Sequence, residues 1–190
     1  RGLGLRGYEV ALAEAGTDLG GRVAKESRLP GLAAWGRVRD YRVGQIQKMP
    51  NVEVYLDSAL SADEVLEFGF DQVAVATGST WRRDGVARFN TLPIAIDPAM
   101  PLFTPDDLMA GRLPHGNVLL YDDDHYYMGG VLAELLVKNG CAVSFVTPSI
   151  RVSDWSYNTL EQAFIQKRLI ELGVDIHVTR GLAGLHRDHA

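Results

Sequence analysis

The sequence predicts an α/β protein made of two Rossmann-like, three-layer units with parallel sheets, the first truncated at its N-terminus. Short apolar runs typical of buried parallel strands alternate with helical segments. This alternation occurs twice, on either side of a stretch that is rich in proline. With 190 residues, the chain is long enough to bury one large core or two small ones.

The first half contains the elements of one such unit. Strands are expected at residues 10–14, 52–56 and 72–76, with a glycine-rich turn at 16–22 after the first of them. Residues 35–49 place apolar side chains among basic ones and predict an amphipathic helix. Ser61 and Glu64 have the spacing of a capping box, and Gly69 is expected to end the turn that follows.

The second half repeats the pattern. Residues 80–116 show little periodicity apart from a short helix near 105–110. Strands are expected at 117–121, 142–146 and 174–178, and helices at 127–138 and 158–172. Asn158 is the expected N-cap of the second helix, and Gly140 and Gly173 are the expected helix stops. We therefore expect a domain at 1–85, a linker at 86–116 and a second domain at 117–190 that is truncated at its C-terminus.

Composition excludes several classes of protein. The net charge of −5 disfavours nucleic acid and anionic membranes as partners. No apolar run approaches the roughly 18 residues of a membrane span. The single cysteine excludes a disulfide framework, and it excludes a cysteine-ligated cluster within this chain. We expect a cytoplasmic protein.

One motif is misleading. Gly2, Gly4 and Gly7 match the dinucleotide fingerprint as a string of letters. The fingerprint requires a preceding strand and a following helix, because the pyrophosphate lies at the N-terminus of that helix. Here a strand follows Gly7 directly. We expect Gly7 to end a helix instead.

Glu14 is the more informative residue. An acid at the end of the second strand of a mononucleotide-binding unit accepts hydrogen bonds from ribose hydroxyls. Such an acid lies about 20 residues after the glycine loop. Counting back from Glu14 passes Arg1, so we expect the first strand and its glycine loop to precede this chain.

Two further segments complete the predicted nucleotide site. Gly20 and Gly21 allow the backbone to approach a phosphate closely, and Arg22 supplies a positive charge. A small-residue turn ends the strand predicted at 72–76, at the edge where such folds bind ligands. The candidate cofactor-binding residues are Glu14, Ala15, Gly20, Gly21, Arg22, Ala76, Thr77 and Gly78.

Taken together, these segments resemble the pyridine nucleotide–flavin oxidoreductases. More narrowly, three strings resemble the branch that contains trimethylamine and dimethylamine dehydrogenases. They are Leu-Pro-Gly-Leu at 29–32, Trp-Gly-Arg-Val-Arg-Asp-Tyr-Arg at 35–42, and Tyr-Asp-Asp-Asp-His-Tyr-Tyr-Met-Gly-Gly at 121–130 with Leu-Ala-Glu at 132–134. The resemblance extends over nearly the whole chain.

The resemblance implies a larger, homodimeric enzyme. Ahead of this region would lie an old-yellow-enzyme-like barrel with FMN and a 4Fe-4S cluster. The enzyme would oxidise a small amine and pass electrons to an electron-transfer flavoprotein. This segment would bind ADP or FAD and would be inactive alone. The alternatives are a segment of an NAD(P)H-dependent enoate or dienoyl-CoA reductase, and a non-catalytic nucleotide-binding or structural module.

The second unit departs from the nucleotide-binding pattern. Asp122, Asp123 and Asp124 stand where a glycine loop would bind pyrophosphate, and they would repel it. We therefore expect a degenerate, nucleotide-free domain. With His125 these carboxylates could form a metal site, but we favour a solvated turn, because consecutive residues rarely converge on one ion.

No residue is predicted to be catalytic or to bind a metal. His177 is expected to be an ordinary strand residue, and His186 and His189 are expected in a loose tail. Trp35, Trp81 and Trp155 are expected to pack in the core or at an interface. Trp81, close to the small-residue turn, is the one to consider for stacking on an adenine.

Overall fold

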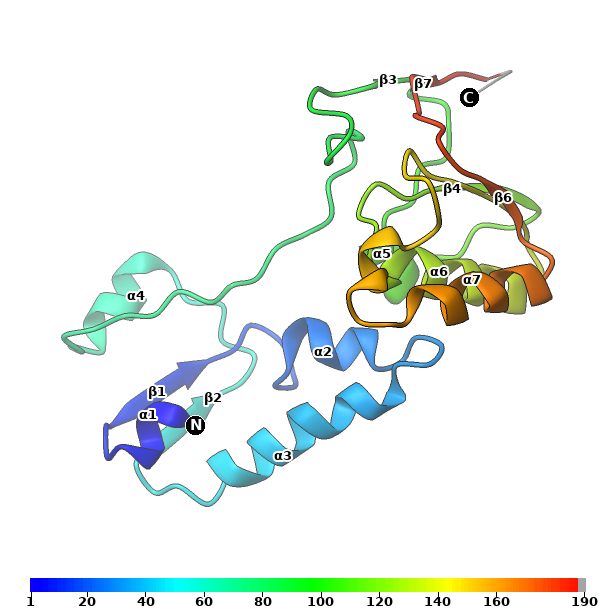
Figure 1. Cartoon of the computed structure of the whole chain (residues 1–190). Coiled ribbons are helices and arrows are strands. Elements are labelled where there is room, and N and C mark those ends of the chain that lie inside the picture. Colours follow the sequence, from blue (N-terminus) through cyan, green and yellow to red (C-terminus); the bar gives the residue numbers. More distant parts are fainter. Residues whose placement is uncertain (188–190) are drawn as a thin grey trace. The chain divides into compact units, whose positions relative to one another are not determined.

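The computed structural model describes residues 1–187, and His189 lies outside them. The chain divides into two compact units (Figure 1). Unit 1 comprises residues 1–28 and 32–79, and unit 2 comprises residues 29–31 and those from 80 onward. Every strand pair in the described part is parallel, as predicted for an α/β protein. Within the same residues, no helix has the length and apolarity needed to cross a bilayer.

Unit 1 contains the predicted strand–helix–strand sequence. Its elements are α1 (Gly2–Leu5), β1 (Val10–Ala13), α2 (Gly21–Glu26), the 3-10 helix η1 (Ala33–Trp35), α3 (Gly36–Ile46), β2 (Val52–Tyr55) and α4 (Ala62–Glu67). β1 pairs with β2 in register, Val10 opposite Val52. The capping box predicted at Ser61 and Glu64 is formed at the start of α4, and Gly69 follows with a φ of 67°.

The glycine string at the N-terminus belongs to a helix end, as predicted. Gly7 has a φ of 85°, the left-handed conformation in which glycine ends helices. Gly4 is buried against β2, and a Cβ there would lie 2.6 Å from Cγ2 of Val52. Asn51 fixes this turn by donating to the carbonyl oxygens of Gly4 and Tyr8, at 3.0 and 2.8 Å. Gly4 thus allows close packing on β2, and Gly7 allows the helix to end.

The buried strand predicted at residues 72–76 is wrong for this chain. The segment forms no strand, and Val73 and Val75 are 55% and 81% exposed. A parallel strand buries an apolar run only when neighbouring strands and helices cover it. β1 pairs with β2 alone among the described strands, so its other edge is open. Residues 72–76 have the apolar composition of a strand, but they lack the neighbouring strands and helices that would bury it.

Unit 2 is built on a three-stranded sheet in the order β4-β5-β6. Its elements are β3 (Ala95–Ile96), α5 (Pro105–Met109), β4 (Asn117–Tyr121), α6 (Tyr127–Lys138), β5 (Ala142–Val146), the 3-10 helix η2 (Asp154–Tyr157), α7 (Gln162–Glu171), β6 (Asp175–His177) and β7 (Gly184–Leu185). α6 and α7 pack against each other beside the sheet (Figure 1). The core between helices and sheet includes Leu132, Leu136, Val143, Phe145 and Leu169.

Most boundaries in unit 2 match the prediction, and Gly140 and Gly173 have the φ values of 82° and 73° expected of helix stops. His177 is a strand residue as expected, half-buried and paired with Asp175. Asn158 is not the N-cap of α7, because it ends η2 and its amide nitrogens donate to the carbonyl of Trp155. Leu160 follows with a φ of 63°, so the helix cannot start before it.

The segment predicted as a linker lies within unit 2. Asp106 and Asp107, in the first turn of α5, hold it in place. The carboxylate of Asp106 accepts from the backbone N–H of Trp81 at 2.7 Å. The buried carboxylate of Asp107 accepts from the N–H of Thr104 at 2.8 Å and pairs with Arg83 and Arg112. The segment lacks hydrophobic periodicity, and hydrogen bonds and ion pairs to these two carboxylates hold it in place instead.

We predict that Asp107→Asn destabilises unit 2 at pH 7 by about 1–3 kcal/mol, through loss of charge-assisted hydrogen bonds. Burial raises the pKa of Asp107, but hydrogen bonds from Thr104, Arg112 and Arg83 outweigh it and leave the pKa below its usual range. This stabilisation is therefore present above about pH 4 and lost as the pH falls. Urea unfolding from pH 7 to 3 measures it. The exposed Asp175→Asn is the control, and equal losses in both variants would contradict the assignment.

Candidate functional site

Glu14 lies directly after β1, at the carboxyl edge of the two-stranded sheet. Its backbone N–H donates to the carbonyl of Tyr55 at 2.8 Å, and its carbonyl accepts from Ser58 at 2.9 Å. The half-buried side chain turns back, so that Oε1 accepts from the N–H of Gly16 at 2.9 Å. A carboxylate has two oxygens and about four acceptor positions. Oε2 makes no described hydrogen bond and is available to a ligand hydroxyl.

The Gly-Gly-Arg turn lies at the start of α2. Gly20 has a φ of 122°, and a Cβ there would lie 2.5 Å from Cδ of Arg39. Gly21 has a φ of 47° and open space around it. Arg22 pairs with Glu26 one helical turn later, at 3.0 Å. Gly20 is thus required by the packing of α3, whereas Gly21 leaves the backbone open to approach.

The third predicted segment is separate from these. Ala76, Thr77 and Gly78 are exposed, and Gly78 has a φ of 76°. None of the described hydrogen bonds joins this segment to Glu14. Ala15 is exposed in the turn beside Glu14. The structure therefore brings Glu14 and Ala15 together but does not join residues 76–78 to them.

In unit 2, the loop after β4 is not a solvated turn, and that prediction is wrong. Asp122, Asp123 and His125 are 4%, 5% and 8% exposed. The Oδ1 atom of Asp122 accepts from the backbone N–H groups of Asp124 and His125, at 3.2 and 3.3 Å. The same side chain packs on α6, where a Cβ on Gly129 would lie 2.7 Å from its Cγ. The carboxyl group thus occupies the space in front of the helix start.

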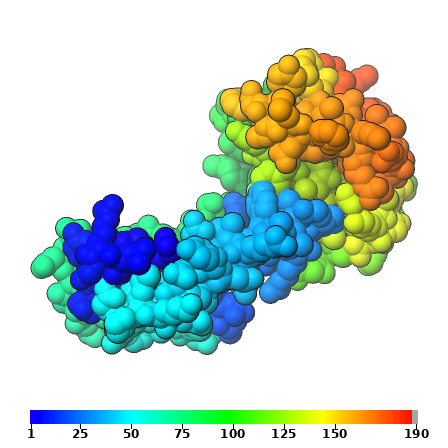
Figure 2. All heavy atoms as spheres, turned by 60° about the horizontal axis from the view of Figure 1, so that its bottom comes forward, coloured from blue at the N-terminus to red at the C-terminus, as the bar shows by residue number. Residues whose placement is uncertain are grey.

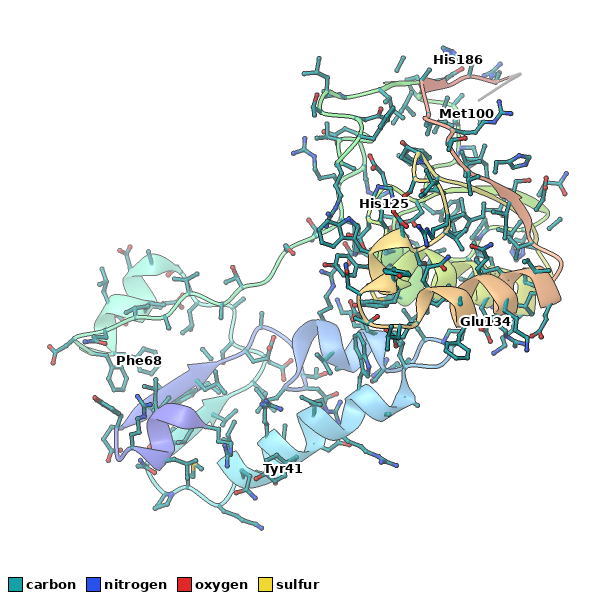
Figure 3. All side chains as sticks on the ribbon, viewed as in Figure 1. Tyr41, Phe68, Met100, His125, Glu134 and His186 are labelled. Atoms are coloured by element: carbon teal, nitrogen blue, oxygen red, sulfur yellow. The ribbon has the colours of Figure 1, made fainter. Side chains whose placement is uncertain are left out.

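Asp123 and His125 continue this buried network, and Figure 3 shows His125 inside unit 2. Asp123 accepts from the N–H groups of Phe89 and Asn90, at 2.8 and 3.3 Å. Nε2 of His125 lies 3.1 Å from Oδ1 of Asp123, and Nδ1 lies 3.4 Å from the hydroxyl of Thr147. The order of carboxylate, imidazole and hydroxyl is that of a hydrolytic triad. Thr147 is fully buried, so no substrate reaches it and the network is structural.

The described residues include no cluster that could hold a metal ion. The metal interpretation of the acidic loop therefore has no support within residues 1–187. The sequence contains one weak sign that the loop after β4 is buried. The loop joins an apolar strand directly to an apolar helix, so it has little room to extend into solvent. No local sequence pattern indicates that the side chain of Asp122 points inward.

Burial raises the pKa of Asp122 to about 6, although the hydrogen bonds from His125 and Asp124 lower it in part. Its Oδ2 atom is buried without a hydrogen-bond partner. An ionised carboxylate is poorly solvated in such a position, so the neutral form is favoured.

Residues 103–183 match a family model described as the OYE-like second alpha/beta domain. The chain is 33% identical over 179 residues to dimethylamine dehydrogenase of Hyphomicrobium sp. (strain x). The matched segment covers 90% of this chain and 24% of that protein.

Solved structures agree with this similarity. Histamine dehydrogenase from Rhizobium sp. 4-9 is 58% identical with a TM-score of 0.94, over 97% of this chain and 29% of that one. A 6-hydroxypseudooxynicotine amine oxidase (HisD) from Pseudomonas geniculata N1 is 46% identical with a TM-score of 0.91, over 97% and 28%. The chain spans about a quarter of the length of these relatives.

We predict that Asp122→Asn makes unit 2 more stable at neutral pH, by about 1–3 kcal/mol. The folded pKa lies above the unfolded value of about 4, so stability is complete below about pH 4 and falls as the pH rises through about 6. The asparagine variant should lose this pH dependence in thermal unfolding. The control is Asp124→Asn in the same loop. If the stability of the Asp122→Asn variant depends on pH as strongly as that of the parent, the assignment is refuted.

Proposed function

We propose that this chain is the nucleotide-binding segment of an OYE-related, amine-dehydrogenase-like oxidoreductase. The observation that carries the proposal is the 58% identity to histamine dehydrogenase over 97% of the chain. The dimethylamine dehydrogenase and amine oxidase similarities support an oxidoreductase that acts on amines. A small amine as the substrate of the whole protein and an electron-transfer flavoprotein as its acceptor belong to this proposal, as does a cytoplasmic location.

Unit 1 would bind the adenosine diphosphate part of ADP or FAD. Oε2 of Glu14, which makes no described hydrogen bond, would accept from ribose hydroxyls at the carboxyl edge of β1. The open backbone at Gly21 and the guanidinium of Arg22 would face the phosphates. Ala15, Gly20, Ala76, Thr77 and Gly78 would complete the site. The nucleotide would be held here without reacting.

The redox groups would lie elsewhere in the parent protein. An iron–sulfur cluster of the 4Fe-4S type needs four cysteine ligands, and this chain has one cysteine, which is buried. We therefore assign FMN and the cluster to the barrel domain expected ahead of this region. In the parent, a strand from that preceding part would lie on the open edge of β1 and cover residues 72–76.

Unit 2 would not bind a nucleotide. The side chain of Asp122 lies against Gly129, where a phosphate would need to approach the start of α6. Asp123 would add a buried negative charge beside it. This arrangement counts against an NAD(P)H-dependent enoate or dienoyl-CoA reductase, which would use a second nucleotide site. The exposed apolar residues 73 and 75 count against a free-standing module.

We predict that Glu14→Ala in the full-length protein weakens ADP binding by about 1–3 kcal/mol, roughly fivefold to 150-fold, because ribose hydrogen bonds to a carboxylate are lost. Isothermal titration calorimetry with ADP measures the change. Glu9→Ala removes an exposed acid just before β1 and should leave the affinity unchanged. If both variants bind ADP like the parent, Glu14 does not contact the ribose.

We also predict that an amine, and not NADPH, reduces the flavin of the full-length protein. The flavin absorbance is followed under anaerobic conditions after mixing with dimethylamine, histamine or NADPH. Rapid bleaching by one of the amines is the expected result. Bleaching by NADPH alone would overturn the amine proposal in favour of the reductase.

A further inference from the structure

The pair Asn139-Gly140 follows α6, and the way the helix ends sets its conformation. Gly140 has a φ of 82°, and its N–H donates to the carbonyl of Val137 at 2.9 Å. The N–H of Cys141 donates to the carbonyl of Leu136 at 3.0 Å. These two hydrogen bonds form a Schellman motif, which places a residue with positive φ after the helix. The helix end therefore favours glycine at 140.

An asparagine followed by glycine can react with its own main chain, because glycine has no side chain to obstruct the approach. The backbone nitrogen of Gly140 forms a bond to Cγ of Asn139, and the side-chain nitrogen leaves as ammonia with the proton that Gly140 gives up. Water then opens the five-membered imide at either of its carbonyl groups. The product is an aspartate or an isoaspartate, in which the main chain runs through the side chain. No oxidant, metal or cofactor takes part.

The folded helix end holds this pair in an unreactive geometry. Asn139 has a ψ of 14°, so its own backbone nitrogen nearly eclipses that of Gly140, and the tetrahedral Cα turns Cβ away. Ring closure requires Cβ to lie close to the attacking nitrogen instead. The N–H of Gly140 is also engaged with Val137, and the side-chain amide of Asn139 donates to the carbonyl of Leu135 at 2.8 Å. These restraints must be released before the nitrogen reaches Cγ.

Release requires only the last turn of α6 to open, and helix ends fray more readily than helix interiors. Asn139 and Gly140 are exposed, and Figure 2 shows atoms of the yellow part of the chain, which includes them, at the surface of unit 2. Lys138 opposes this fraying. It pairs with Glu134 one turn earlier, at 2.6 Å, and places a positive charge at the negative end of the helix.

We propose that Asn139 is a site of spontaneous deamidation, which the C-terminal motif of α6 suppresses and fraying of the last turn permits. The product weakens the motif that suppressed the reaction. A carboxylate at 139 places negative charge at the negative end of the helix and cannot donate to Leu135. Isoaspartate lengthens the main chain just before β5, whose first residue Ala142 pairs with Asn117. This proposal does not depend on the proposed redox function.

Peptide mass spectrometry of the full chain tests the proposal by following the conversion of each side-chain amide to a carboxyl group at neutral pH. One sample is folded and another is kept in urea. Asn158 is the matched control, because it is exposed and its amide donates to the carbonyl of Trp155, but threonine follows it. We expect Asn139 to be converted before Asn158 in both samples. Loss of the helix-end hydrogen bonds in urea should speed conversion at 139 by about tenfold.

Lys138→Gly tests the role of the last turn. Glycine lowers helix propensity and removes the pair with Glu134, so conversion at 139 should be about three- to fivefold faster in the folded variant and unchanged in urea. Lys167→Gly is its control, because it removes the corresponding pair with Glu171 in α7. Circular dichroism checks that both variants fold.

Faster conversion in folded Lys138→Gly but not in folded Lys167→Gly supports the proposal. Three results overturn it: conversion at 139 no faster than at 158, equal rates at 139 in the folded chain and in urea, or the same response to both lysine variants.

Discussion

Asp123 is the acceptor around which the irregular parts of unit 2 are arranged. Its carboxylate receives the backbone N–H groups of Phe89 and Asn90 and the imidazole of His125. Buried carboxylates are stable only where several donors surround them. The position of Asp123 therefore requires that the segment before α5 closes over the end of β4. Asp107 imposes the same requirement at the start of α5, where it gathers Thr104 and two arginines.

The two units differ in how the acid at the end of a strand is hydrogen-bonded. In unit 1, the acid at the strand end is half-buried and keeps one oxygen free, which suits a ligand with hydroxyl groups. In unit 2, Asp122 accepts from the backbone of its own loop and packs against α6, and its second oxygen is buried without a hydrogen-bond partner. Similar strand–helix arrangements thus hold the acidic side chain in different environments in the two units. The strand-end carboxylate keeps a free oxygen in unit 1 and is buried in unit 2, and the proposal that only unit 1 binds a nucleotide rests on this difference.

The sequence predicted the elements whose residues carry their own signal. The strand at 117–121, the helix at 127–138 and the capping box at Ser61 follow from local periodicity and local hydrogen bonds. Residues 72–76 have the composition of a strand, but pairing depends on distant neighbours that composition does not report. The inward orientation of Asp122 was missed because it depends on the open space at Gly129, seven residues away. Glu14, Gly20 and Gly21 lie at the strand end and in the turn that the sequence predicted, whereas residues 76–78 follow no strand. The binding function of all these residues stays a prediction.

The contact between Asp122 and Gly129 has an evolutionary consequence. A side chain on Gly129 would collide with the carboxyl group, whereas shortening Asp122 first would leave two backbone N–H groups without an acceptor. Enlarging Gly129 or truncating Asp122 to alanine alone is therefore destabilising, whereas Asp122→Asn keeps an oxygen that can accept from both N–H groups. Residue 129 tolerates little besides glycine while residue 122 carries this side chain, so the two positions are expected to covary.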